Sequence, residues 1–368
     1  APGPARNRDP PSRRPEVGHP HDPAPISARP STIGPSPPRY RPTEAAQLPR
    51  SPRMLEFILW ILLSLVLLYF GAEWLVRGSA DFAARVGLTP IVIGLTVVAY
   101  GTSMPELVVS SKAALAGQGD IAVGNAVGSN IFNIGVILGL SALLCPLRVQ
   151  SQIIRLDAPI MLGVSLLLLV LLRDSHLSRL EGAGLTLGIV VYTVANIRAA
   201  RRETSQVVHQ EFAGSMPKPT GSMARDAAFI LAGLAVLVAG SRLLVHNSVG
   251  LAKLLGISEA VIGLTIVAAG TSMPELATSL LAAWRRQPDI AVGNVIGSNI
   301  YNILAILGLS GLLSPLHAPG IRMLDLYVML GLTALLVPLL WTRAVLNRWE
   351  GGVLVAAFFG YLYILWPK

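Results

Sequence analysis

Two glutamates end identical segments of the chain, Gly-Thr-Ser-Met-Pro-Glu, at Glu106 and Glu275. Each segment lies inside a long apolar stretch, where a carboxylate costs at least roughly 2.5 kcal/mol to insert into a bilayer. The proline before each glutamate has no N–H, so a carbonyl in the preceding helical turn loses its partner. Carboxylate, carbonyl and hydroxyl oxygens therefore gather at two places, which favours cation binding over packing alone.

A second pattern follows each motif. Ser129 and Asn133 are four residues apart and share a helix face, and Ser298 and Asn302 repeat this spacing in the second copy. We interpret these four side chains as ion contacts. Four further amides suit interhelical hydrogen bonds as well as they suit ion contact: Asn125, Asn130, Asn294 and Asn299.

The ligand types indicate which ions the two motifs could hold. Oxygen donors with two carboxylates suit Ca²⁺, which takes six to eight oxygens in irregular geometry. Copper or zinc would call for His or Cys ligands, and the sequence has no cluster of these residues with metal-ligand spacing. Two glutamates balance one divalent ion, or bind Na⁺ or protons in its place. Competition for such a charge-limited site provides exchange.

The composition points to a lipid environment for these motifs. Of the 368 residues, 52% are hydrophobic and 13% are charged, and the mean hydropathy is +0.60. Soluble domains carry roughly 25% charged residues. The apolar runs are continuous rather than alternating, which excludes the pattern of barrel strands. Ten stretches approach the roughly 20 residues that a helix needs to span a bilayer: 55–76, 88–113, 121–145, 156–173, 180–198, 226–246, 257–283, 290–315, 323–341 and 350–366.

The two halves of the chain are copies. A shift that places Glu106 on Glu275 also aligns Ile93–Pro146 with Ile262–Pro315 without a gap, and most positions are identical. Five spans per copy is an odd number, so the second copy enters the membrane from the opposite side. The sequence therefore predicts an all-α integral membrane protein with ten transmembrane helices in two inverted five-helix repeats.

Four segments follow from this division. Residues 1–53 are a Pro- and Arg-rich extension, which we expect to be disordered rather than to bind nucleic acid. Met54 directly precedes the first apolar run, and we interpret it as the true start. Residues 54–198 and 226–368 are the two repeats, joined by the loop 199–225. The excess of basic residues in alternate loops predicts that 199–225 is cytoplasmic and that both termini are outside.

At these motifs the sequence resembles the sodium/calcium exchangers of the cation/calcium antiporter superfamily, especially their prokaryotic branch, over nearly all of 54–368. The resemblance implies that Glu106 and Glu275 are the calcium carboxylates and that the carbonyls of Thr102 and Thr271 are calcium ligands too. It implies that the first and sixth spans slide across the core to alternate access. It also implies sodium sites from those residues together with Ala99, Ala268, Ser103, Ser272, Ser129 and Ser298, completed by Asn133 and Asn302.

The sequence departs from some relatives at one pair of positions. Some relatives carry Asp where this chain has Asn133 or Asn302. Two amides leave a formal site charge of −2 rather than −3, which bears directly on sodium stoichiometry and on proton coupling. The loop 199–225 is also too short for a calcium-sensing regulatory domain.

The leading hypothesis is a Na⁺/Ca²⁺ antiporter that works by alternating access and extrudes Ca²⁺ across the plasma (inner) membrane of a prokaryote. We expect a multi-pass protein in the lipid bilayer, plausibly monomeric, without a cofactor. An antiporter of H⁺ for Ca²⁺ or another divalent cation that uses the same site is the alternative. A channel fits the paired motifs less well. An enzyme is disfavoured because Ser103 and Ser272 have no nearby His or Lys base.

Overall fold

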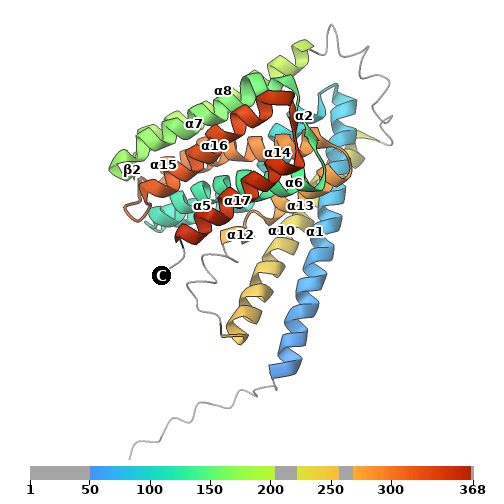
Figure 1. Ribbon diagram of the computed structural model, residues 1–368, viewed down its shortest axis with the longest axis vertical. Coiled ribbons are helices and arrows are strands. Elements are labelled where there is room, and N and C mark those ends of the chain that lie inside the picture. Colours follow the sequence, from blue (N-terminus) through green and yellow to red (C-terminus); the bar gives the residue numbers. More distant parts are fainter. Residues whose placement is uncertain (1–49, 204–221, 257–267, 366–368) are drawn as a thin grey trace, which may run out of the picture. The chain divides into compact units, whose positions relative to one another are not determined.

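The computed structural model of the protein describes residues 50–203, 222–256 and 268–365, which lie in a single unit (Figure 1). Seven of its helical runs are long and apolar enough to cross a bilayer. An eighth candidate is a bent pair, Pro90–Thr102 with Met104–Leu115. The seven are Arg53–Val86, Gly119–Leu144, Ile153–Asp174, Arg179–Ala199, Met223–Leu254, Pro288–Leu313 and Met323–Trp341.

Two of the ten predicted spans are not among these candidates. The first part of the predicted span 257–283 lies outside the described residues. The predicted span 350–366 corresponds to a helix, Arg348–Leu365, that carries Arg348 and Glu350 near its start. The many-span, all-helical membrane fold is confirmed, and the count of ten stays a prediction.

The first half of the chain forms a succession of helices that short π-helical stretches interrupt. Its first helix starts before Met54, so residues 50–53 of the predicted extension are helical, and its last helix runs past 198 into the predicted loop. The elements are α1 (Arg50–Val86), α2 (Pro90–Ile93), η1 (Gly94–Val98), α3 (Ala99–Thr102), α4 (Met104–Leu115), α5 (Gly119–Phe132), η2 (Asn133–Leu138), α6 (Gly139–Leu144), β1 (Leu147–Arg148), η3 (Ile153–Asp157), α7 (Ala158–Leu171), η4 (Leu172–Asp174), β2 (His176–Leu177) and α8 (Arg179–Glu203).

The second half repeats much of this order. The rest of the loop 199–225 up to residue 221 lies outside the described residues, and a long helix begins directly after it. The elements are α10 (Met223–Leu254), α12 (Ala268–Gly270), α13 (Met273–Trp284), α14 (Pro288–Tyr301), η6 (Asn302–Leu307), α15 (Gly308–Leu313), β3 (Leu316–His317), α16 (Met323–Arg343), β4 (Val345–Leu346) and α17 (Arg348–Leu365).

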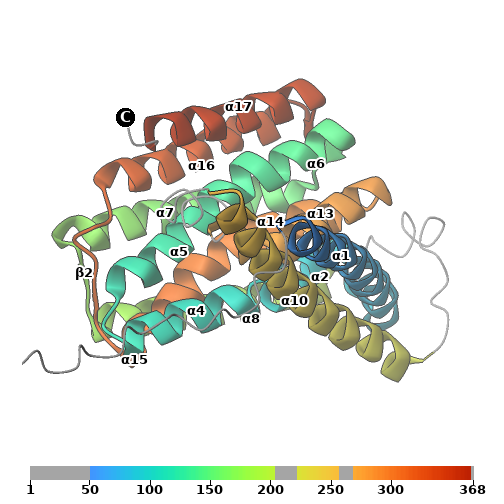
Figure 2. The same ribbon diagram turned by 90° about the horizontal axis from the view of Figure 1, so that it is seen from below.

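The long helices α1 and α10 form a closely packed pair (Figure 2). Glycines bring their backbones together: a Cβ atom on Gly71 would lie 2.9 Å from the Leu237 nitrogen, and one on Gly233 would lie 2.7 Å from the Leu75 nitrogen. At one end of the pair Arg85 donates to the fully buried Asp226 over 2.7 Å. Close backbone approach through small residues is the usual way for helices to associate in lipid.

Two short antiparallel strand pairs join the halves at their loops. Strand β1 pairs with β4, with Leu147 opposite Leu346. Strand β2 pairs with β3, with His176 opposite His317. The helix α14 is almost wholly buried, so it forms the centre of the core. Each strand pair thus links a loop of the first half to a loop of the second.

The contact between α1 and α10 predicts that alanine destabilises the protein at Gly233 but not at a glycine outside this contact. Gly233→Ala should lower the free energy of unfolding by about 1–3 kcal/mol, because overpacking costs that much. Gly331→Ala in α16 is the matched control, since its Cβ would meet nothing within 4 Å, and alanine should there be neutral or slightly stabilising. Thermal unfolding in detergent measures both variants, and equal midpoints would contradict the proposed close packing.

Candidate functional site

Both copies of the repeated motif break their helix at the serine. Ser103 has φ −84° and ψ 8° between α3 and α4, at a 48° bend between the runs Pro90–Thr102 and Met104–Leu115. Ser272 has φ −86° and ψ 11° between α12 and α13. The prolines then lie in the first turn of the new helices, where no N–H is needed. The glutamates follow in the same turns, where the positive end of the helix dipole favours a carboxylate.

Reciprocal hydrogen bonds join the two halves at these glutamates. Ser272 Oγ donates to Glu106 Oε1 over 3.0 Å. Ser103 Oγ donates to Glu275 Oε1 over 2.7 Å. Both carboxylates are buried, at 1% exposure each. Each half therefore supplies the hydroxyl that partly satisfies the carboxylate of the other half.

The serines of α5 and α14 stand beside the motif serines. Ser129 Oγ lies 3.1 Å from Ser272 Oγ, and Ser298 Oγ lies 3.0 Å from Ser103 Oγ. The four hydroxyls and two carboxylates thus form two equivalent clusters, Ser103 and Ser298 with Glu275, and Ser272 and Ser129 with Glu106, which we together call the candidate ion centre. Two further pairs of residues are described next, Asn133 with Asn302 and Asn125 with Asn294.

Several buried oxygens of this region have no hydrogen-bond donor. Glu106 Oε2 and Glu275 Oε2 are without a partner, and so are the amide oxygens of Asn133 and Asn302. A buried acceptor without a donor costs about 1–3 kcal/mol, and more when it is charged. Such orphaned acceptors in corresponding positions of both halves are the arrangement that a bound cation would satisfy.

The two asparagines stand at the first residues of π-helical stretches. Asn133 opens η2 and Asn302 opens η6. π-helical turns inside α-helices frequently lie at functional sites. Asn302 Nδ2 donates to Asn130 Oδ1 over 2.9 Å, and Asn130 Nδ2 donates to the Asn299 carbonyl over 3.2 Å. Asn130 therefore orients Asn302, which agrees with the hydrogen-bonding interpretation of Asn130.

The other pair of amides supports the backbone of the glutamates. Asn125 Nδ2 donates to the Glu106 carbonyl over 3.2 Å and to Ser110 Oγ over 2.9 Å. Its Oδ1 accepts from Thr271 Oγ1 over 3.3 Å. Asn294 makes the corresponding bonds to the Glu275 carbonyl, Ser279 and Thr102. Each amide thus binds the first turn of a helix in its own half and a threonine of the other half.

The remaining predicted ligands are backbone carbonyls near the breaks. The Ala99 carbonyl lies in α3 and accepts from the Ser103 N–H over 3.1 Å. Ala268 is the first residue of α12, and its side chain is outside the part that the structure describes. The fold places the predicted residues around the two breaks, and their role as ligands stays a prediction: Ala99, Thr102, Ser103, Glu106, Ser129, Asn133, Ala268, Thr271, Ser272, Glu275, Ser298 and Asn302.

Three serines near the candidate ion centre escaped the sequence analysis. Ser110 and Ser279 are the hydroxyl partners of Asn125 and Asn294, and their identity in both copies was a usable signal. Ser241 Oγ donates to the Gly270 carbonyl over 2.6 Å, the carbonyl that Pro274 deprives of its helical partner. The equivalent position in the first copy is Ala72, so the repeat gave no hint of Ser241.

Within the described ranges, no group of three or more His, Cys, Asp or Glu side chains could hold a metal ion. The candidate ion centre has two carboxylates and otherwise neutral hydroxyl, amide and carbonyl oxygens. Neutral oxygens with few carboxylates suit weakly held hard cations better than tightly bound transition metals.

Comparisons with known proteins agree with this geometry. The sequence model of a family described as "Sodium/calcium exchanger protein" matches residues 56–198 and 226–366. The "Putative antiporter CaxA" of Alkalimonas amylolytica is 40% identical over 86% of this chain and 100% of its own length. The "Inner membrane protein YrbG" of Escherichia coli is 37% identical over 83% of this chain and 95% of its own length.

Solved structures of the sodium-calcium exchanger NCX_Mj have a similar fold. The structure soaked with zero Na⁺ and Ca²⁺ has a TM-score of 0.74 and 32% identity, and the match covers 85% of this chain and 100% of that one. Others were soaked with Na⁺ together with Ca²⁺ or Sr²⁺. The similarity therefore extends over nearly the whole unit that carries the candidate ion centre.

The orphaned oxygens predict that each glutamate is required for cation binding. Glu106→Gln and Glu275→Gln should each weaken Ca²⁺ binding about a hundredfold or more, because removing one partner of a buried ion pair costs about 3–5 kcal/mol. Equilibrium ⁴⁵Ca²⁺ binding to the purified protein measures the effect. Glu56→Gln, at an exposed position near the start of α1, is the matched control. Normal binding by either buried variant would rule out the candidate ion centre.

Proposed function

Because the chain belongs to the sodium/calcium exchanger family of antiporters, we propose that it exchanges Na⁺ for Ca²⁺ at the candidate ion centre by alternating access. The observation that carries this proposal is the set of four orphaned oxygens on Glu106, Glu275, Asn133 and Asn302. They come equally from both halves, and two of them are carboxylate oxygens. A hard cation among them would gain the ligands that the fold leaves without donors.

The two carboxylates account for competition between the ions. One Ca²⁺ neutralises both, and Na⁺ ions that bind the same oxygens must leave before Ca²⁺ enters. Ser103 Oγ donates to one oxygen of Glu275, and Ser272 Oγ donates to one oxygen of Glu106. The lone pairs of both serine hydroxyl oxygens therefore remain available to Na⁺. We assign the twelve predicted residues to this exchange, with the glutamates shared by both ions and the Thr102 and Thr271 carbonyls facing Ca²⁺.

We further propose ten membrane spans in two inverted repeats, 54–198 and 226–368, joined by a cytoplasmic loop at 199–225. The two separate matches to one family model, at 56–198 and 226–366, support this division. So do the hydrogen bonds that recur at equivalent positions of the two copies, such as those of Asn125 and Asn294. A relative named as an inner membrane protein supports an inner-membrane location. Extrusion of Ca²⁺ by a monomer completes the proposal.

Exchange of H⁺ for Ca²⁺ is the second candidate. The free oxygens of Glu106 and Glu275 that would bind a cation could each accept a proton instead. Two protons would then replace one Ca²⁺ without any other change in the site. The hydroxyls of Ser129 and Ser298 favour Na⁺, because protons do not need such additional ligands.

Uptake of ⁴⁵Ca²⁺ into proteoliposomes distinguishes the two couplings. Vesicles loaded with Na⁺ should accumulate Ca²⁺ when diluted into Na⁺-free buffer, whereas K⁺-loaded vesicles at the same pH should not. An imposed pH gradient without Na⁺ should give no uptake above the K⁺ control. Uptake driven by the pH gradient alone would replace the Na⁺ assignment with the H⁺ one, and uptake under no gradient would contradict both.

A third carboxylate in the candidate ion centre should change the ion count. Asn302→Asp places an acid where an orphaned amide oxygen now stands, which raises the formal charge to −3. We expect a steeper dependence of Ca²⁺ uptake on Na⁺ concentration, because more monovalent charge is needed for balance. Gln118→Glu, at an exposed position just before α5, is a control for added charge outside the centre. An unchanged Na⁺ dependence in Asn302→Asp would contradict the assignment of Asn302.

A further inference from the structure

Two histidines from different halves of the chain lie opposite each other in one of the short strand pairs. His176 of β2 and His317 of β3 are register partners. One position along, the Ala318 N–H donates to the Ser175 carbonyl over 2.8 Å. The His176 N–H is bonded instead to Asp174 Oδ1 over 3.0 Å. The two histidines therefore form a non-hydrogen-bonded pair, in which opposite Cα atoms lie only about 4.5 Å apart.

Both histidine side chains stand on the outward face of this strand pair. The neighbouring register pair, Leu177 and Leu316, is fully buried. Successive side chains of a strand point to opposite faces, so the histidines point away from the core that the leucines join. His176 is half-buried and His317 is exposed. An ion from solution can therefore reach both imidazole rings.

The spacing of these two rings suits a transition-metal ion. Neutral imidazole is the commonest metal ligand in proteins. In a tetrahedral zinc site with Zn–N distances of about 2.0–2.1 Å, the two nitrogens lie about 3.4 Å apart. Opposite Cβ atoms about 4.5–5.5 Å apart allow two imidazoles to converge to that separation. Among the described residues no third His, Cys, Asp or Glu side chain joins the pair, so water would complete the coordination shell.

The other strand pair shows that the fold does not require histidines at these positions. A buried leucine pair recurs in β1 and β4, but the outward pair is Arg148 opposite Val345. The internal repeat aligns these two residues with His317 and His176, respectively. Arginine has no acceptor atom and valine has no polar atom, so neither side chain can bind a metal ion. The facing histidines are thus a property of one strand pair only.

We propose that His176 and His317 form an accessory site for Zn²⁺ or a similar transition-metal ion, separate from the candidate ion centre. A bound ion ties a loop of the first half to a loop of the second. Strand β3 lies against the start of α5, because a Cβ atom on Gly119 would collide with the His317 carbonyl. Ser129 of the centre lies further along α5, about 15 Å from Gly119 along the helix axis. Nitrogen ligands select ions that the oxygen-lined centre does not favour.

Calorimetric titration with ZnCl₂ tests the site on the full chain, purified without a polyhistidine tag. Excess Ca²⁺ in the buffer keeps Zn²⁺ from the candidate ion centre. His176→Asn and His317→Asn should each weaken Zn²⁺ binding at least about tenfold, because loss of even an outer-shell partner of a metal costs that much. The variant that lacks both histidines should bind Zn²⁺ about as weakly as either single variant, since one histidine alone cannot chelate.

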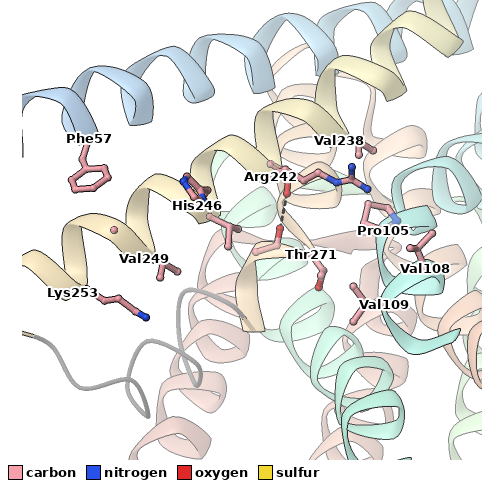
Figure 3. A pocket seen from close by; sticks show the side chains of 14 residues that line it. Phe57, Pro105, Val108, Val109, Val238, Arg242, His246, Val249, Lys253 and Thr271 are labelled. Carbon is pink, nitrogen blue, oxygen red and sulfur yellow. Dashed lines mark hydrogen bonds between the residues drawn. The ribbon is translucent and has the colours of Figure 1, made fainter. Parts of the chain in front are cut away.

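His246 supplies the matched control, because it is a described histidine at another place in the fold. It lines a cavity of about 690 Å³ between α10 and α4, together with Arg242 and Lys253 (Figure 3). Two basic side chains, and no second histidine among the described residues of its wall, make that cavity unsuitable for a metal cation. His246→Asn should therefore leave the Zn²⁺ dissociation constant unchanged.

A gain-of-function variant tests the geometry itself. Arg148→His combined with Val345→His places the same pair on the outward face of β1 and β4, and should add a second equivalent of bound Zn²⁺. Unchanged Zn²⁺ binding in His176→Asn and His317→Asn, no binding to the wild type, or no added equivalent in the gain-of-function variant would each overturn the inference. Size-exclusion chromatography checks that every variant elutes as a single species, and glutamine replaces asparagine at any position where it does not.

Discussion

The reciprocal hydrogen bonds between Ser103 and Glu275 and between Ser272 and Glu106 are the constraint on which the rest of the structure depends. A buried carboxylate loses its hydration, and charge-assisted hydrogen bonds, a cation or a proton must offset that loss. Here each carboxylate receives one hydroxyl from the other half and keeps one oxygen free. Among the described residues, the hydroxyl that bonds each carboxylate comes from the other half, so the centre is assembled where the two halves meet.

The helix breaks near the glutamates follow from this contact between the two halves. The helices must end just before each glutamate to present its carboxylate and the serine hydroxyl together, and the break at each serine provides this. Asn125 and Asn294 then hold the restarted helices by their first-turn carbonyls. The elements that surround the centre are thus held at the breaks by side-chain bonds both within each half and between the halves.

The motifs predicted much of this centre because polar groups inside a bilayer are costly and therefore conspicuous. Glu106, Glu275 and the neighbouring serines were singled out by their repetition, by their place inside apolar runs and by the family resemblance. The Asn130–Asn302 bond joins positions far apart in the chain, and nothing in the spacing indicates it. Ser241 was missed because its counterpart is alanine. The ends of α1 and α10 lie beyond the apolar runs, since hydropathy marks what lies in lipid and not where a helix stops.

The amides at Asn133 and Asn302 have a consequence for the membrane potential. With two carboxylates as its formal charge, a centre that holds one Ca²⁺ is electrically neutral, and so is one that holds two Na⁺. A membrane potential of 100 mV does about 2.3 kcal/mol of electrical work on each net elementary charge that crosses the membrane. Under the proposed exchange, movement of the Ca²⁺-loaded centre is therefore nearly independent of voltage. Any electrical work in the cycle must be done on a Na⁺ ion in excess of two, which these two amide oxygens would have to accommodate.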